Sequence, residues 1–325
     1  MRVLVALGGN AMTGPGGDAT PEAQRAAIAI ASEHLAALVA AGHEVVVTHG
    51  NGPQVGNLLV KNELAAHVVP PVPLDWCGAQ TQGTIGFTLL DTLEAALGSV
   101  GMDAPPPVAA VITRTLVDPD DAAFAHPTKP IGRFLPREQA QALIDHGERW
   151  EDRGEQGWRR VVASPEPVEV LDIPALRTLL AAGYVVVTAG GGGIPVVRGA
   201  DGVGRGVEAV IDKDLTAALL ARSVDADVLV IATDVAHAVV GWGTPDAHDL
   251  GTVSLAEMEA YAADGHFASG SMGPKVEAAL RFVRAGGSRS IITALDQLAS
   301  AVDGHIGTVI DNALDHVNEN PATER

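Results

Sequence analysis

The sequence predicts an α/β fold in which a largely parallel sheet carries helices on its outside. Two observations favour this fold. Short runs of apolar, mostly β-branched residues end repeatedly in glycines, and each run is followed by a segment with the composition of a helix. Strands and helices that alternate in this way are typical of a parallel sheet joined by crossover helices. The recurring unit is strand, glycine turn and helix.

The first 66 residues contain this unit twice. The run VLVAL at 3–7 predicts a buried strand that ends in GGN, and a helix is expected from the N-cap residue Thr20 to a stop at Gly42. The run EVVVT at 44–48 predicts a second strand, which ends in HGNG. The proline that follows opens another helix, to about residue 66.

Later elements follow the same pattern. A strand end within 73–83 should lead into a helix to about residue 97, and a strand is expected at 108–113. The remaining predicted elements are helices at 174–182, 213–222, 257–264 and up to 283, and strands at 185–188, 228–232 and 290–293. The strand at 185–188 precedes four consecutive glycines, 190–193. Residues 313–325 are polar and are predicted to be a frayed tail.

One long stretch interrupts this order. Between 118 and 167, charged and turn residues become more frequent and the apolar periodicity weakens. A stretch of this length inside an α/β unit is typical of a functional insertion or lid. The alternative is a surface excursion without a role.

Composition narrows the function. A chain of 325 residues with 47% hydrophobic residues can bury a substantial core, and its formal charge of −19 disfavours nucleic acid and anionic lipid as partners. The single cysteine, Cys77, excludes an internal disulfide and fits a reducing compartment. The apolar start is too short for a signal peptide, and no run of about 18 apolar residues predicts a membrane span. We therefore expect a soluble, cytoplasmic protein with no membrane partner.

The basic residues are unevenly divided between the two types. Of 21 lysines and arginines, only four are lysine: Lys61, Lys129, Lys213 and Lys275. Lysines kept in an arginine-rich chain are candidates for positions that need a compact ammonium group. Chance alone is the alternative interpretation.

Three glycine turns, LGGN, HGNGP and AGGGG, leave backbone N–H groups at strand ends. Such turns bind anions, and ligands of open α/β sheets lie beyond the carboxyl ends of the strands. We therefore expect the turns to line one crevice that holds phosphate. The sequence Asp212-Lys213-Asp214 stands at the next helix start, where an ammonium between carboxylates suits phosphate chemistry. Taken alone, ordinary loops and a solvated first turn explain these features equally well.

The known phosphate motifs do not match. A P-loop fails because Pro274 precedes Lys275 and Val276 follows it, and a dinucleotide fingerprint is missing. HExxH, CxxC and GxSxG are also missing, which removes zinc peptidases, thiol oxidoreductases and α/β-hydrolases. Phosphoryl transfer without a P-loop remains, a reaction that needs mainly cations and positioning. All lysines except Lys61 lie in a Gly/Pro-framed turn or at a helix start.

Eight phrases in order carry a resemblance to the carbamate kinase family of the amino-acid kinase superfamily. The resemblance extends from residue 3 to about 308, and the phrases read LVALGGNAM, THGNGPQVGNLL, PLDWCGAQTQGTIG, PTKPIGRF, VVASPEP, AGGGGIPV, GVEAVIDKD and GHFASGSMGPK. Ala6 stands where many relatives outside the carbamate kinases have a lysine, which argues against acetylglutamate, glutamate or aspartate kinase.

This resemblance implies a three-layer αβα sandwich with a protruding lid at about 118–167. One amino-acid kinase domain would cover 1–325, with an N-terminal carbamate lobe at about 1–197 and a C-terminal nucleotide lobe at about 198–312. The implied reaction is ATP + carbamate = ADP + carbamoyl phosphate, with Mg²⁺ carried by the nucleotide. A homodimer and a place in arginine metabolism, purine breakdown or carbamoyl phosphate supply are also implied.

The resemblance also implies residue roles. The implied catalytic residues are Lys129, Lys213, Lys275 and Asp214, with Asp212 as a weaker candidate to orient the lysines. The implied substrate-binding residues are Gly8, Gly9, Asn10, Gly50, Asn51, Gly52, Gly190, Gly191, Gly192 and Gly193. The implied nucleotide-binding residues are Thr233, Asp234, Gly270, Met272 and Lys275, and no protein metal site is implied.

Several positions depart from the family pattern. Ala163, Arg133 and Ser269 each replace a proline, and 236–239 replace a charged pair and a tyrosine near the adenine. Residues expected to be structural are His49 as a hydrogen-bonded turn residue, Cys77 as core filler, and Trp150, Trp158 and Trp242 as packing residues.

Three alternatives stay open. A related kinase could phosphorylate another small carboxylate, and a non-catalytic carbamoyl-phosphate sensor would bind without turnover. A Rossmann oxidoreductase is the third, without its glycine fingerprint.

Overall fold

An eight-stranded sheet forms the centre of the computed structural model, which describes residues 1–145, 147–267 and 272–314. Its strand order is β15-β17-β16-β12-β1-β2-β9-β3, and every neighbouring pair is parallel except β16 and β17. The strands are β1 (Arg2–Leu7), β2 (Glu44–His49), β3 (Val108–Ala110), β9 (Val185–Val187), β12 (Val228–Thr233), β15 (Thr252–Val253), β16 (Arg289–Ala294) and β17 (Thr308–Asp311). The largely parallel sheet is therefore confirmed.

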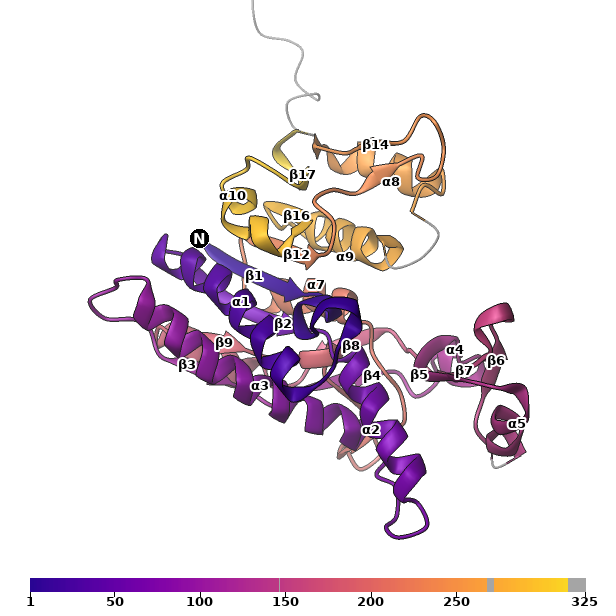
Figure 1. Cartoon of the computed structure of the whole chain (residues 1–325). Helices are drawn as coiled ribbons and strands as arrows, with labels where there is room; N and C mark the ends of the chain where they lie inside the picture. The colour runs from indigo at the N-terminus through magenta and orange to yellow at the C-terminus, as the bar shows by residue number, and fades with distance from the viewer. Residues whose placement is uncertain (146, 268–271, 315–325) are drawn as a thin grey trace, which may run out of the picture.

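Helices cover both faces of this sheet (Figure 1). One face carries α1 (Pro21–Ala40), α3 (Leu74–Ser99) and α10 (Leu298–Val302), and the other carries α6 (Ile173–Ala181), α7 (Lys213–Ser223), α8 (Leu255–Ala263) and α9 (Met272–Arg284). Alternate residues of a strand point to opposite faces, so Val3 and Val5 enter the first core while Leu4 and Ala6 enter the second. Burial on both faces explains the continuous apolar strands and confirms the three-layer sandwich.

The strand register brings the first two glycine turns to the same edge of the sheet. Leu7 of β1 pairs with His49 of β2 on one side and with Ala232 of β12 on the other. The three strands therefore end level with one another at the same edge of the sheet. The turns that follow them begin side by side at this edge.

The insertion folds as a small protruding subdomain. It leaves the main body between β4 (Arg114–Val117) and β8 (Pro167–Val170), which belong to a second sheet of order β11-β10-β4-β8 with β10 (Ile194–Arg198) and β11 (Gly204–Gly206). The subdomain contains α4 (Ala122–Ala125), α5 (Arg137–Asp145) and an antiparallel sheet of β5 (Lys129–Leu135), β7 (Trp158–Val162) and β6 (Trp150–Asp152). Figure 1 shows it apart from the main body. The protruding subdomain is confirmed, and its role as a lid stays a prediction.

The subdomain rests on α2 (Gly52–Ala65). Gly56 lies opposite Gly132 where the two backbones meet, and a Cβ built on Gly56 would be in ordinary contact with the Gly132 Cα, at 3.5 Å. Ile131 packs into a small core with residues of α2, and Arg133 makes an ion pair of 2.9 Å with Glu63. Arg133, which departs from the family pattern, thus contributes a contact between the subdomain and α2.

Some expectations need correction. The stretch 73–83 contains no strand end, because α3 begins at Leu74 and buries residues one turn apart, such as Cys77 and Thr81. The predicted strand at 108–113 stops at Ala110. Trp150 packs in the subdomain core and Cys77 is buried, but Trp242 is 75% exposed and is not a packing residue.

The division into lobes at about 197 and 198 stays a prediction, since the central sheet runs through both parts. Of the predicted tail, 315–325 lie outside the described residues. None of the described helices combines the length and the apolar character that a membrane crossing requires.

Candidate active site

The first two glycine turns touch each other at the carboxyl edge of the sheet. The Gly8 amide donates to the Ala232 carbonyl and the Gly50 amide to the Leu7 carbonyl, each at 3.0 Å. A Cβ built on Gly50 would lie 3.1 Å from the Gly9 nitrogen and 3.5 Å from Cδ of Lys213. Glycine is therefore needed where the two turns and the lysine stem meet.

The third glycine turn is packed more tightly still. Gly191 and Gly192 have φ angles of +65° and +89°, a region that favours glycine. A Cβ on Gly191 would lie 2.1 Å from Nδ2 of Asn51, and one on Gly192 would lie 2.7 Å from the Ile211 carbonyl oxygen. The turn thus lies directly against the second turn and against the residues that lead into α7.

Side chains from two helices hold this third turn. Gln82 of α3 donates to the Gly190 carbonyl at 3.1 Å, and Thr216 of α7 donates to the Gly192 carbonyl at 3.0 Å. Asn51 in turn donates to Thr81 of α3 at 2.8 Å. Gln82, Thr216 and Thr81 were not singled out from the sequence, because amide and hydroxyl side chains in helices carry no local signal of such contacts.

Asp212 begins α7 and also reaches the protruding subdomain. Its Oδ1 accepts the amide of Asp214 at 2.9 Å, and its Oδ2 accepts Nζ of Lys129 at 2.8 Å. Burial acts to raise the pKa of the Asp212 carboxyl, but the charge and hydrogen bond of Lys129 outweigh it and lower this pKa below its ordinary value. Asp212 therefore pairs with Lys129, whereas the family resemblance made it a weaker candidate to orient Lys213 and Lys275.

Asp214 joins the remaining two lysines. Lys213 donates to its Oδ1, and Nζ of Lys275, from the first turn of α9, lies 3.4 Å from its Oδ2. The side chains of Lys213 and Lys275 are only 14% and 10% exposed, and that of Asp214 is 5% exposed. A buried charge is stable only when it is paired with an opposite charge. The two lysines and Asp214 therefore depend on one another for their burial.

The structure therefore brings Lys129, Lys213 and Lys275 to two carboxylates at the start of one helix. The fourth lysine, Lys61, lies exposed on α2. The catalytic role of the clustered lysines stays a prediction.

A cavity of about 500 Å³ opens beside this cluster. Six of the predicted site residues line it: Gly8, Gly9, Lys213, Thr233, Asp234 and Lys275. Residues not predicted also line it: Ala11, Ile30, His34, Ala232, Ala294, Leu295 and Asp296. Residues 294–296 follow a predicted strand, so their position at the site could have been predicted. Nothing in the local sequence marks His34 on α1 as a site residue.

Other predicted site residues lie nearby or outside the described part. Met272 begins α9 and packs against the hydrophobic core. Gly270, like the departure Ser269, lies outside the described residues. Asn10 belongs to a short helical turn at Gly9–Met12 after β1, and its side chain is likewise not described.

Residues 236–239, which depart from the family pattern, make hydrogen bonds and strand pairings that support the fold after β12. The Ala238 amide donates to Thr308 Oγ1 at 2.8 Å, and His237 Nδ1 lies 3.1 Å from the Leu250 carbonyl oxygen. Val239 begins β13 (Val239–Val240), which pairs with β14 (His248–Asp249).

Ala163, which also departs from the family pattern, is buried, and its carbonyl accepts the Val210 amide at 3.0 Å.

His49 is a structural residue of the second turn, as expected. It is 1% exposed, and its Nδ1 lies 2.8 Å from the Gly50 carbonyl oxygen. A Cβ on Gly190 would lie 2.3 Å from the His49 ring. Burial, opposed by the Gly50 hydrogen bond and assisted by the charge of Lys213, lowers the pKa of His49 to about 4. The ring is thus neutral at neutral pH.

This shift predicts acid destabilisation. Because the folded-state pKa lies below the unfolded value, the stability is complete above about pH 6.5 and should fall by about 3 kcal/mol as the pH approaches about 4. Denaturant unfolding of the wild type and His49→Asn should be compared between pH 7 and pH 4. The free-energy difference between them should narrow over this range, and a constant difference would contradict the assignment.

Comparisons with known proteins agree with this geometry. The model of the amino acid kinase family matches residues 1–294. Carbamate kinase from Thermococcus kodakarensis is 44% identical over 315 residues, which cover 95% of this chain and 98% of that protein. Carbamate kinase 1 from Enterococcus faecium is 44% identical over 312 residues, again covering 95% and 98%.

A solved structure agrees as well. Carbamate kinase from Giardia lamblia bound to AMP-PNP superposes with a TM-score of 0.89 at 41% identity, covering 96% of this chain and 98% of that one. The match extends over the central sheet, the subdomain and the glycine turns together, since nearly the whole of both chains is covered. The chain therefore belongs to the amino acid kinase family and, within it, to the carbamate kinases.

Proposed function

We propose that this chain catalyses the reversible reaction ATP + carbamate = ADP + carbamoyl phosphate. The observation that carries the proposal is the cluster in which Asp214 holds Lys213 and Lys275 where the glycine turns meet. Phosphoryl transfer passes through a loose transition state with charge on its equatorial oxygens, so cations and backbone donors supply most of the catalysis. The relatives named carbamate kinase support this substrate pair.

The nucleotide would occupy the cavity of about 500 Å³ beside the C-terminal ends of β12 and β16. Thr233, Asp234 and Lys275 line it, and Nζ of Lys275 lies 3.4 Å from Asp214. The Giardia lamblia relative, described as bound to AMP-PNP, supports a nucleotide here. Carbamate would lie across Lys213, against Gly50, Asn51 and the turn at 190–193.

Each charged residue would then have a distinct task. Lys213 and Lys275 would neutralise the phosphoryl group as it moves in line between two oxygens, and Asp214 would hold both ammonium groups in place. Lys129 would reach the same group from the subdomain, whose closure excludes water. Asp212, which forms an ion pair of 2.8 Å with Lys129, would position this lysine.

Magnesium would enter with the nucleotide. Asp234 and Asp296 are the carboxylates that line the cavity, and carboxylate and water oxygens are the ligands that Mg²⁺ prefers. These two side chains would hold the hydrated ion beside the phosphates. The ion would supply charge neutralisation at the β- and γ-phosphate oxygens.

A homodimer is the proposed assembly. Trp76 and Phe87, 62% and 54% exposed, lie on the outward face of α3 at helical spacing. Beside α3, β3 is the edge strand of the central sheet, and Ile112 just beyond it is 51% exposed. A second copy of the chain would cover this apolar helix face and the open sheet edge together.

A cytoplasmic location is also proposed. The only cysteine, Cys77, is buried, and burial raises the pKa of its thiol above the ordinary value. With a single, buried thiol the chain can form no internal disulfide, so it does not need an oxidising compartment for its stability. The acidic overall charge suits a freely diffusing enzyme.

A coupled assay tests the reaction. The purified chain with Mg-ADP and carbamoyl phosphate should form ATP, and acetyl phosphate and other acyl phosphates serve as the comparison panel. Higher kcat/KM for another acyl phosphate would favour the kinase of a different carboxylate. Saturable binding of carbamoyl phosphate without ATP formation would favour a non-catalytic sensor.

A further inference from the structure

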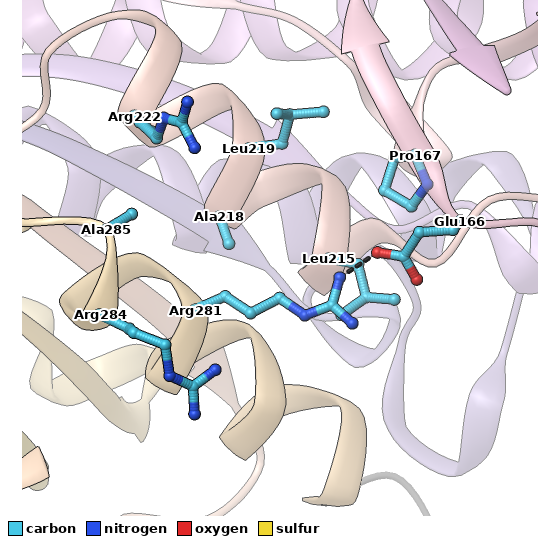
Figure 2. Close-up of a pocket in the computed structure, with 9 residues that line it drawn as sticks. All are labelled: Glu166, Pro167, Leu215, Ala218, Leu219, Arg222, Arg281, Arg284 and Ala285. Atoms are coloured by element: carbon cyan, nitrogen blue, oxygen red, sulfur yellow. Dashed lines mark hydrogen bonds and ion pairs between the residues drawn. The ribbon is translucent and has the colours of Figure 1, made fainter.

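A second cavity, of about 400 Å³, has no residue of the glycine turns in its lining. Figure 2 shows it between α7 and α9, with Glu166 and Pro167 at one end. Its apolar lining comes from Leu215, Ala218 and Leu219 of α7 and from Ala285 after α9. Arg222, Arg281 and Arg284 complete the lining.

This concentration of guanidinium groups is unusual for a chain with a formal charge of −19. Arg281 pairs with Glu166 and, at 2.6 Å, with Glu277, while Arg284 pairs with Glu259 at 2.7 Å. Arg222 makes no ion pair with any residue that the structure describes, and it is exposed. The side chains of Arg281 and Arg284 remain 38% and 52% exposed, so a ligand can still reach them.

The chemistry of these pairs selects the ligand. A monocarboxylate ligand would replace the Glu166 carboxylate at Arg281 by another carboxylate. Because a surface ion pair of this kind contributes little binding free energy, the exchange would give little affinity. A phosphate carries up to two charges and three oxygens, so it can engage several guanidinium forks at once and outcompete a single carboxylate. The apolar lining beside Leu215 and Leu219 would accommodate a small apolar body on the phosphate.

The location connects this cavity to two other parts of the molecule. Leu215 follows Asp214 directly, and Arg281 lies on the helix whose first turn carries Lys275. Glu166 stands where the protruding subdomain rejoins the main body, and its amide donates to Oδ2 of Asp121 at the other root, at 2.9 Å. The Arg281–Glu166 pair thus ties α9 to the base of the subdomain.

We propose that this cavity is a second anion site, which takes a phosphate monoester with a small apolar body. The guanidinium groups of Arg222, Arg281 and Arg284 point in different directions in Figure 2. The occupant turns them toward one phosphate group and draws Arg281 away from Glu166. Release of Glu166 loosens the connection between α9 and the root of the subdomain. The site is therefore suited to regulation by a phosphorylated metabolite, whatever reaction the chain performs.

Phenyl phosphate is the probe, titrated against the full-length protein and followed by ³¹P NMR. We expect a Kd on the order of 1 mM, typical for so small a ligand. Arg222→Gln and Arg284→Gln should each weaken binding by about fivefold or more, because each removes a charge-assisted contact to the phosphate. Glu166→Gln should instead tighten binding by about two- to fivefold, because it removes the competing carboxylate. Benzoate, the monocarboxylate control, should bind more weakly than phenyl phosphate.

Phenyl phosphate can also enter the candidate active site, so each titration is repeated in a Lys275→Met background, because Lys275 does not line the second cavity. The same dependence on Arg222 and Arg284 is expected there. An unchanged Kd in Arg222→Gln, a loss of binding confined to Lys275→Met, or weaker binding in Glu166→Gln would each overturn the proposal. The last outcome would show that Glu166 only maintains the structure. Thermal unfolding of every variant verifies that it is folded.

Discussion

Replacing Lys213 or Lys275 by methionine is expected to lower kcat by about 10²–10³, the loss typical when one preorganised donor to a transition state is removed. Each ammonium is held on Asp214 in a largely buried setting, where its charge acts on the moving phosphoryl group with less screening than in bulk water. Methionine keeps most of the apolar stem and removes only the charge. Steady-state kinetics in the direction of ATP formation measures the effect.

Lys61→Met is the matched control, because Lys61 is the one lysine on an exposed helical surface. Its kcat should equal that of the wild type. The active-site variants should remain folded, since Asp214 keeps one of its two lysine partners in each. Near-normal kcat in either active-site variant would show that these lysines are structural.

Gly191→Ala is expected to have the second large effect. The residue has φ +65°, and the new Cβ would lie 2.1 Å from Nδ2 of Asn51, so Asn51 must leave its place beside Thr81. We expect the left-handed conformation to cost about 1–3 kcal/mol of stability and the displaced turn to lower kcat/KM by about 10²-fold. Denaturant unfolding and kinetics together measure both parts.

Gly202→Ala separates strain from displacement. Gly202 has φ +76°, but a Cβ there would meet nothing within 4 Å. It should therefore lose stability without losing activity. If Gly191→Ala is as active as Gly202→Ala, the close approach of the turns at Asn51 and Gly191 does not contribute to activity.

The central sheet could be predicted because its strands are buried on both faces. Val3 and Leu4 enter opposite cores, so the whole run must be apolar, and glycines mark where it ends. The helix from Thr20 was equally clear, since Thr20 caps α1 by accepting the Ala23 amide at 3.4 Å. Both signals are local in the sequence.

The antiparallel parts could not be predicted in the same way. Strand β7 carries two adjacent arginines, Arg159 and Arg160, because the small subdomain sheet has no second layer to bury both faces. A register shift between Ile131 and Phe134 further breaks the alternation of β5. Strand β17 is short, and its partners lie elsewhere in the chain.

Some residues of the candidate site could be predicted from local sequence, and others could not. The glycine turns and lysines stood out because their residue types are unusual where they occur. The pairing of Lys129 with Asp212 did not, because 83 positions separate the two residues. His34 and Gln82 reach the site from long helices whose pattern records only which face is buried. Contacts of this kind depend on the tertiary fold.

The chain offers one direct test of the lysine cluster, because it contains only four lysines. Amine acetylation can be measured at each of them by mass spectrometry, with and without Mg-AMP-PNP and carbamoyl phosphate. We expect slower modification of Lys129, Lys213 and Lys275 when these ligands are present, and an unchanged rate at Lys61. Equal protection of all four lysines, or no protection at Lys213 and Lys275, would contradict this expectation.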